Sequence, residues 1–272
     1  MTNCSITNPI EIAKKWFEVI GFSKEVGQEF YKSINNYKID TDASIYTYDK
    51  ECEDGIKNLI YYLYFCENAK ELYIEKGIPE EILISTIKDI KIWCDTWSKI
   101  KGRLYLGELP WLDRHLSLKL FQLGRLQFCM QKAPCDIDKY GVKKGEGVIG
   151  IHIPEGEKLS VDACNESINQ AREFFDRYFP EFNYKIFTCH SWLLDQQLEK
   201  FLSAESGIIK FSNLFDKVDK NESYCNLKFL FSRETTVENL IDKQPTSSLS
   251  AKVKYAVLNG EKFYEVLGVI KK

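Results

Sequence analysis

Three histidines are the residues of this chain best suited to move protons near neutral pH. His152 stands late in the apolar stretch "GVIGIHIP", and His190 stands late in "YKIFTCHSWLL". Both stretches predict strands, and the late positions of strands are where open α/β sheets bind ligands. His115 falls on the leucine side of a short predicted helix, where we expect it to pack. Cys189 directly precedes His190, but neighbouring strand residues point to opposite faces, so the pair does not predict a thiolate–imidazole nucleophile.

The segment after His152 predicts a tight acidic turn followed by a long helix. Such junctions often hold a phosphate-bearing ligand, because a helix N-terminus attracts anions. Here the turn carries Glu155 and Glu157, the first helical turn adds Asp162, and Ser160 is a favourable N-cap residue. Acidic side chains stabilise a helix N-terminus by themselves. The residue types therefore favour a capped helix and leave a phosphate site as the alternative.

The elements that would position these residues fall into two parts. The first hundred residues predict helices, such as "PEEILISTIKDIKIWCDTWSKI", whose apolar residues recur at helical spacing. The remainder predicts a long amphipathic helix near residues 161–178 and strands near residues 103–109, 125–131, 147–154, 184–194, 226–231 and 261–270. We therefore expect an α+β protein, with a helical bundle in residues 1–101 packed on a mixed α/β sheet domain in residues 102–272.

The composition argues against several classes of protein. The chain has a net charge of −3, with 28% charged and 44% hydrophobic residues, and so lacks the broad basic surface of nucleic-acid-binding proteins. Nine cysteines occur without a C-x-x-C spacing, and no other metal-ligand spacing occurs, so we expect no metal. We find neither a signal-peptide pattern nor an apolar stretch of membrane-spanning length. We expect a cytoplasmic protein with neither nucleic-acid nor membrane partners.

Three phrases resemble a known family. They are "LGELPWLDRHLSLKLFQLGRLQF" (residues 106–128), "IHIPEG" (residues 151–156) and "CHSWLLD" (residues 189–195). Each is similar to the bacterial acyltransferase family that joins an N-terminal helical domain to a GNAT-like C-terminal domain, within the GNAT N-acyltransferase superfamily. The element order over residues 125–270 also resembles the later half of a GNAT enzyme. The resemblance implies a GNAT-like second domain, and transfer of an acyl group from acetyl-CoA or another acyl-CoA to an amine.

The resemblance also implies where CoA would bind. In such folds, backbone N–H groups after the fourth strand hold the pyrophosphate, which here points to Ile153, Glu155, Gly156 and Ser160. The family signature at this place is Arg/Gln-x-x-Gly-x-Gly/Ala. This chain offers a single glycine there and carboxylates where phosphates would lie.

Acyl transfer needs a base for the amine and an acid for the leaving thiolate. On the GNAT-like arrangement, His152 is the first candidate for the base and His190 the second. The alternative for each is a hydrogen-bonded structural histidine. Glu108, in "GELPW", could bind the acceptor amine or act through water; the simpler interpretation is a solvated or capping carboxylate.

Two other functions stay open at this point. A domain that kept the fold but lost the CoA site would bind a small molecule or a protein partner, and side chains such as Phe187 or Trp192 would fill the cleft. An acyl carrier protein as the donor would instead require a basic patch, for which Lys139, Lys143 and Lys144 are candidates. Donor, acceptor and oligomeric state cannot be deduced from these residues.

Overall fold

The computed structural model describes residues 8–272, and its contacts divide the chain into two compact units that meet between Leu123 and Gly124. The predicted division after residue 101 lies earlier in the chain. The difference arises because the helix at residues 109–116 and the strand at residues 120–123 pack on the helices of the first unit. The start of the chain, which bears on the expected lack of a leader, lies outside the described residues.

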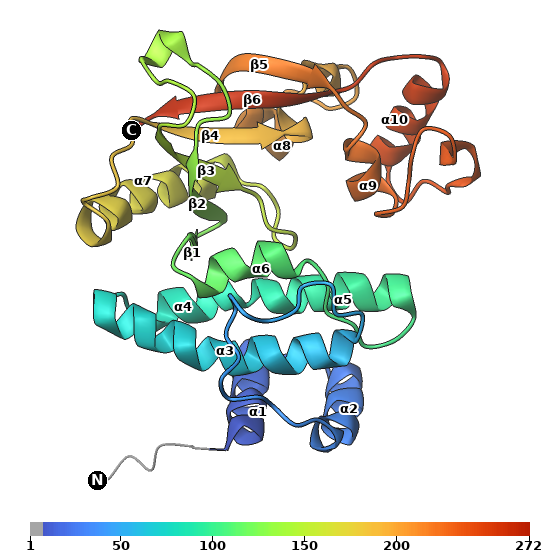
Figure 1. Ribbon diagram of the computed structural model, residues 1–272. Coiled ribbons are helices and arrows are strands. Elements are labelled where there is room, and N and C mark those ends of the chain that lie inside the picture. Colours follow the sequence, from blue (N-terminus) through green and yellow to red (C-terminus); the bar gives the residue numbers. More distant parts are fainter. Residues whose placement is uncertain (1–7) are drawn as a thin grey trace. The chain divides into compact units, whose positions relative to one another are not determined.

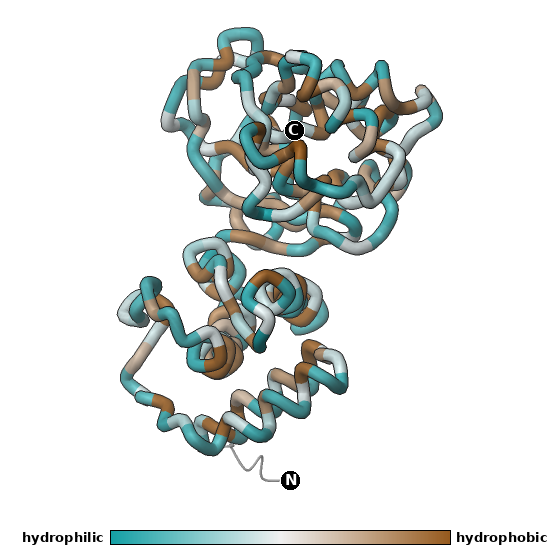
Figure 2. The backbone as a smooth tube through the Cα atoms, turned by 90° about the vertical axis from the view of Figure 1, so that its right-hand side faces the viewer, coloured by the Kyte–Doolittle hydropathy of each residue, from teal (hydrophilic) through white to brown (hydrophobic). Residues whose placement is uncertain are grey.

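The first unit is helical (Figure 1). Its elements are α1 (Pro9–Ile20), α2 (Lys24–Ser33), η1 (Ile34–Asn36), α3 (Gly55–Lys76), α4 (Glu80–Ile87), α5 (Asp89–Lys101), α6 (Leu109–Leu116) and the strand β1 (Leu120–Leu123). Asn8 caps α1, because its Oδ1 accepts the Ile10 N–H at 3.0 Å. Hydrophobic and hydrophilic residues alternate along α1 in Figure 2, the pattern of a helix with one buried face. Trp16, Tyr62 and Phe65 are among the largest fully buried side chains.

The second unit is built on a sheet in which its strands follow the order β2-β3-β4-β6-β5. Its elements are β2 (Leu126–Lys132), η2 (Asp138–Tyr140), β3 (Gly147–His152), α7 (Val161–Tyr178), β4 (Ile186–Ser191), η3 (Trp192–Leu194), η4 (Gln196–Lys200), α8 (Gly207–Ser212), β5 (Asp216–Glu222), α9 (Asn226–Leu230), η5 (Leu240–Asp242), α10 (Ser248–Leu258) and β6 (Tyr264–Lys271). β3 and β4 are parallel, whereas β2–β3, β4–β6 and β5–β6 are antiparallel. The predicted α+β architecture is confirmed.

Different side chains pack on the two faces of this sheet. On one face Phe128 and Phe187 meet edge to face at 5.9 Å, and Arg172 of α7 lies over the Phe187 ring at 5.7 Å. On the other face, Val148 and Ile186 belong to a buried cluster with Ile137, Val142, Leu267 and Val269. Successive side chains along each strand point to opposite faces of the sheet, as the pleat requires.

Two predicted strands are absent from the structure, and a further strand was not predicted. Residues 103–109 form no strand, because Leu104 and Leu106 are buried as an irregular connection between α5 and α6. Residues 226–230 form the short helix α9 instead of a strand, since Leu227 packs in a cluster with α10 rather than in the sheet. The strand β5 was not predicted, because "DKVDKNE" is polar and lies at the sheet edge.

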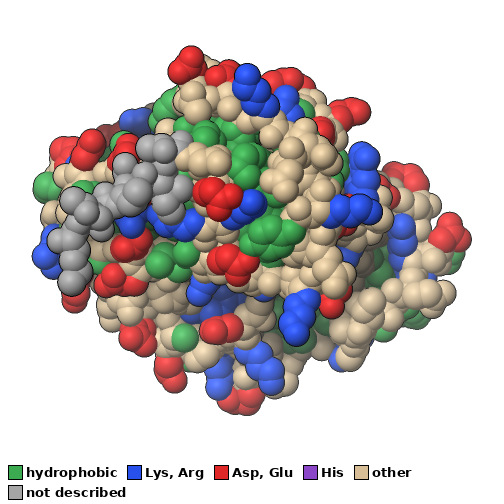
Figure 3. Space-filling model, turned by 90° about the horizontal axis from the view of Figure 1, so that it is seen from below, with side chains coloured by type: hydrophobic (Ala, Val, Ile, Leu, Met, Phe, Trp, Pro, Cys, Tyr) green, Lys and Arg blue, Asp and Glu red, His purple; other side chains and the backbone are tan. Residues whose placement is uncertain are grey.

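None of the eight cysteines within residues 8–272 forms a disulfide. No helix of this range is long and apolar enough to cross a membrane. On the face seen in Figure 3, Lys and Arg side chains are interspersed with Asp and Glu, so this face carries no field of one sign.

Candidate functional site

The carboxyl ends of β3 and β4 form the candidate site. Their parallel ladder consists of two register pairs, Ile149 with Phe187 and Gly150 with Thr188. Both strands continue beyond these pairs. His152 still pairs with Gln127 of β2, whereas His190 pairs with Leu267 of β6. The two strand ends are thus held by different neighbours, at the edge where open sheets bind ligands.

The register places His152 and His190 on the same face of the sheet. Gly150 and Thr188 are register partners, and each histidine stands two residues further along its strand. Gly150 lacks a side chain where the Gln131 side chain crosses to donate to Thr188 Oγ1 at 3.2 Å. A Cβ atom on Gly150 would lie 2.5 Å from the Gln131 amide. The Gln131–Thr188 hydrogen bond on this face therefore requires a glycine at position 150.

The two histidines differ in accessibility. The His190 side chain is 49% exposed, and its Nδ1 lies 4.0 Å from Oε1 of Glu265, whose side chain is 33% exposed. His152 is only partly exposed, at the end of β3. His190 thus combines access with a nearby carboxylate, which are two features of a residue that exchanges protons with a bound molecule.

Cys189 does not share this site. Its side chain is 1% exposed and burial raises the pKa of its thiol, so the reactive thiolate is disfavoured. The rings of Phe187 and Trp192 pack against other aromatic side chains. Phe187 contacts Phe128 on the opposite face from the histidines, and Trp192 stacks on Phe229 at 6.1 Å. The cleft-filling role considered for Phe187 and Trp192 gains no support from these contacts.

The turn between β3 and α7 holds the residues predicted to bind CoA. Ile153 is partly exposed, and Glu155, Gly156 and Ser160 are exposed. Ser160 stands at the N-cap position of α7 with extended backbone, but its side chain makes no capping hydrogen bond. The first N–H groups of a helix have no partner within the helix. The expected hydroxyl cap is therefore missing, and the N-terminus of α7 keeps its capacity to bind an anion.

A cation that we did not predict from the sequence lies behind this turn. Arg125 donates from Nη1 to the Pro154 carbonyl at 3.1 Å and from Nη2 to the Glu157 carbonyl at 2.7 Å. Burial lowers the pKa of its guanidinium. Its backbone N–H also donates to Ser167 Oγ of α7 at 2.7 Å. Arg125 is the second residue of the tight turn before β2. It thus joins the start of β2 to the turn after β3 and to α7.

A second backbone contact shapes the same turn. Gly207, the first residue of α8, packs against Leu159 so closely that a Cβ atom would lie 2.0 Å from the Leu159 carbonyl oxygen. No rearrangement of a side chain relieves this contact, because the opposing atom belongs to the backbone. The turn is therefore held from one side by Arg125 and from another by α8.

The remaining predicted residue, Glu108, belongs to the helical unit. It precedes α6 with φ 58° and ψ 35°, in the left-handed region that non-glycine residues rarely occupy. Its carbonyl accepts the Trp111 and Leu112 N–H groups at 3.0 and 3.1 Å. Its side chain makes no capping hydrogen bond, so the capping interpretation of this carboxylate is not what the structure shows.

His115 is a packing histidine, as its place on the leucine side of α6 predicts. It is fully buried, with Nε2 3.0 Å from Asp89 Oδ2 and Nδ1 3.2 Å from the Trp111 carbonyl oxygen. The same Asp89 oxygen accepts the indole N–H groups of Trp93 and Trp111 at 3.0 Å each. This buried polar cluster joins α5 to α6.

The basic residues considered for a carrier-protein donor are largely neutralised. Lys139 pairs with Asp216, and Lys143 pairs with Asp136 at 3.1 Å and Asp138 at 2.7 Å. A patch whose cations already face carboxylates offers little attraction to an acidic partner. Across residues 8–272, no group of three or more His, Cys, Asp or Glu side chains is arranged to hold a metal ion.

Comparisons with known proteins identify the family. The GNAT-like C-terminal domain family matches residues 120–270, and the N-acyltransferase N-terminal domain family matches residues 17–118. No curated protein matches the chain. Two solved structures share its fold over 96% of this chain and 88% of theirs. An acyltransferase in complex with decanoyl-CoA and teicoplanin has a TM-score of 0.77 and 23% identity, and an acyltransferase mutant in complex with octanoyl-CoA has a TM-score of 0.78 and 22% identity. The chain belongs to the N-acyltransferase family that combines this N-terminal domain with a GNAT-like C-terminal domain.

Proposed function

We propose that this protein transfers an acyl group from acyl-CoA to an amine of an acceptor molecule. The observation that carries the proposal is the different pairing of the β3 and β4 ends, with the N-terminus of α7 following β3 and an accessible histidine at the end of β4. The similar acyltransferases are described in complex with decanoyl-CoA, octanoyl-CoA and CoA. We infer from them that the donor is an acyl-CoA.

The pyrophosphate of the donor would lie at the N-terminus of α7. Its oxygens would accept backbone N–H groups of the turn 153–160 and the first turn of α7, where the helix dipole favours negative charge. Glu155 and Gly156 are exposed there and contribute backbone rather than side chains. Arg125 supplies positive charge behind the turn and fixes its carbonyls away from the phosphates. The site thus replaces the second glycine of the family signature by an arginine-held turn.

The reaction that fits this arrangement is direct transfer. A histidine accepts a proton from the acceptor ammonium, and the neutral amine nitrogen then attacks the thioester carbonyl carbon. A C–N bond forms, the C–S bond breaks, and the departing CoA thiolate takes up a proton. Of the two candidates, we favour His190 over His152, because its side chain is more accessible and lies near Glu265.

A contact between Glu108 and the acceptor amine stays a prediction, because Glu108 belongs to the helical unit and both candidate bases belong to the sheet unit. A glutamate in the left-handed region costs about 1 kcal/mol or more, a strain that proteins tend to keep at functional sites. Its carboxylate is free of capping and can therefore attract a cationic amine.

The first experiment measures binding and transfer separately. Calorimetry with CoA, acetyl-CoA, octanoyl-CoA and decanoyl-CoA gives the donor affinity, and release of the CoA thiol with a panel of amines gives the transfer rate. For His190→Gln we expect unchanged donor binding and a rate lowered roughly a hundredfold or more. His152→Gln is the matched variant on the neighbouring strand. A larger loss with His152→Gln would transfer the base role to His152, and no donor binding by the wild-type protein would refute the proposal.

A further inference from the structure

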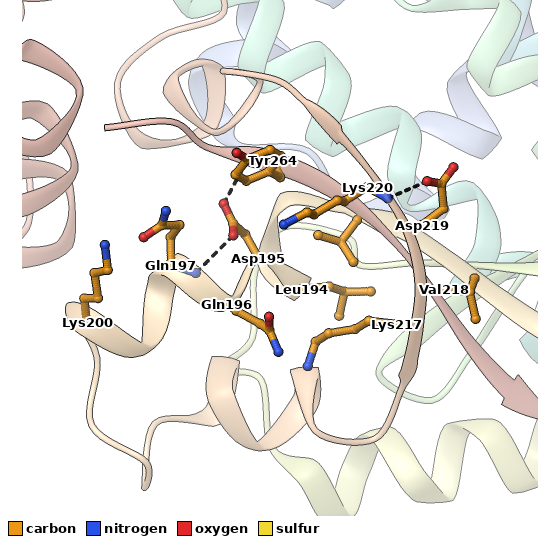
Figure 4. A pocket seen from close by; sticks show the side chains of 11 residues that line it. Leu194, Asp195, Gln196, Gln197, Lys200, Lys217, Val218, Asp219, Lys220 and Tyr264 are labelled. Atoms are coloured by element: carbon orange, nitrogen blue, oxygen red, sulfur yellow. Dashed lines mark hydrogen bonds between the residues drawn. The ribbon is translucent and has the colours of Figure 1, made fainter. Parts of the chain in front are cut away.

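A second cavity lies on the edge of the sheet, outside the site described above. Its volume is about 630 Å³, within the range of small-molecule sites. It is lined by residues of η3, η4, β5 and β6, and neither His152, His190 nor any residue of the turn 153–160 belongs to the lining. Figure 4 shows its polar side chains, which include Lys217, Lys220 and Gln197.

A β-bulge gives this cavity its charge. In a regular strand, Lys217 and Lys220 would point to opposite faces, because they stand three residues apart. The pairing of β5 with β6 shifts between Lys217 and Asp219, so Lys217 pairs with Gly268 and Lys220 pairs with Val266. Since these partners stand two residues apart on β6, the two lysines lie on the same face. Bulges that re-aim side chains in this way occur often beside binding sites.

The two lysines are available for a ligand. Neither Lys217 nor Lys220 forms an ion pair within residues 8–272, whereas Lys200 at the cavity rim pairs with Glu261 at 2.9 Å. The Lys220 ammonium is held 4.5 Å from the centre of the Tyr264 ring. In Figure 4 both lysine side chains extend from β5 toward the side of the cavity formed by η4.

The carboxylates of the cavity are already satisfied by the backbone. Asp195 is 95% buried, and its two oxygens accept the Gln197 and Tyr264 N–H groups at 3.0 and 2.8 Å. Asp219 accepts the Lys220 N–H at 2.8 Å, and its register partner Leu267 lies on the opposite face from the two lysines. Lys220 attracts the Asp195 carboxylate, but neither Lys217 nor Lys220 forms an ion pair with Asp195 or Asp219.

One polar atom in the lining lacks a partner. Gln197 Oε1 is buried and has no hydrogen-bond partner within the described chain. A buried acceptor without a donor is costly, and a ligand hydroxyl or N–H group would satisfy it. Leu194, Val266 and the Tyr264 ring add an apolar wall.

We propose that this cavity is a second binding site, for a small molecule that carries an anionic group, a carboxylate or a phosphate, together with a hydrogen-bond donor. Lys217 and Lys220 contact the anion, and Gln197 accepts from the donor. The inference does not rest on the proposed acyl transfer, since it concerns different residues and can be tested without an acyl donor.

The test measures the reactivity of individual lysines. The full chain is acetylated with an amine-reactive reagent, with inorganic phosphate or succinate as the probe, and peptide mass spectrometry reports the extent of modification at each lysine. We expect one or both probes to protect Lys217 and Lys220 and to leave the exposed Lys132 unprotected. Protection by phosphate alone would identify the phosphate class, and protection by succinate alone the carboxylate class.

Variants make the test sharper. In Lys217→Gln, the probe concentration that half-protects Lys220 should rise about tenfold, and Lys220→Gln should have the same effect on Lys217. Lys132→Gln removes one charge from the same unit outside the cavity and should change neither value. Protection of all three lysines alike, or no protection with up to about 10 mM of either probe, would overturn the proposal. A circular dichroism spectrum of each variant verifies that it is folded.

Discussion

Replacing Arg125 by methionine tests whether this residue holds the turn that is proposed to bind the donor. The guanidinium makes two hydrogen bonds to backbone carbonyls, at 3.1 and 2.7 Å. Hydrogen bonds from charged donors contribute about 1.5 to 3 kcal/mol each when buried. Because the side chain is partly exposed, solvent screening lowers the sum, and we expect a loss of roughly 2 kcal/mol in the free energy of unfolding.

The loss should also appear in donor binding. Without its two anchors, the turn 153–160 must be ordered by the ligand, and we expect the dissociation constant of CoA to rise about tenfold. Urea denaturation and calorimetry measure the two effects. Arg177→Met, which removes an exposed arginine from the far end of α7, should stay within about 0.5 kcal/mol of the wild type. If Arg125→Met behaves like Arg177→Met in both assays, the reasoning about the turn is refuted.

Three further predictions concern packing and charge. Gly207→Ala should weaken CoA binding at least tenfold, since its Cβ would lie 2.0 Å from the Leu159 carbonyl oxygen; calorimetry showing wild-type affinity would contradict this. Asp89→Ala leaves two indole N–H groups without their shared buried acceptor and removes the carboxylate that lies 3.0 Å from His115 Nε2, so urea denaturation should show a loss of about 3 kcal/mol, and a change below about 1 kcal/mol would count against that role. Burial raises the pKa of Asp195, so its ionisation disfavours the folded state. The unfolding free energy of the wild type should therefore fall relative to that of Asp195→Asn as pH rises from about 4. A rise would contradict a raised pKa of Asp195 in the folded state.

The acidic turn after β3 departs from the family signature, and an anion site at this turn stays a proposal. The carboxylates of Glu155 and Glu157 are exposed and can point into solvent, while the backbone of the turn is held by Arg125. Motif comparison examines side chains in one short segment. It does not detect a cation that is distant in sequence and reaches the backbone of that segment.

Much of the architecture follows from local pattern. The cap at Asn8, the amphipathic α7 and the apolar β3 and β4 are each visible within a window of a few residues, because capping and periodic burial are local effects. The three family phrases carry the assignment to an N-acyltransferase, which the family matches confirm. The histidines late in β3 and β4 were also identifiable, although their roles stay predictions.

Only the tertiary structure decided the features that depend on pairing between distant segments. The strand β5 is polar and forms because β6 offers it an edge, and its bulge alone brings Lys217 and Lys220 to one face. Register between β3 and β4 puts His152 and His190 on a common face, and the folded chain brings Arg125 to the turn after β3. Residue types and local periodicity determined which elements form and which family they belong to. The juxtaposition of the chemical groups was decided by long-range pairing, which leaves no local periodicity in the sequence.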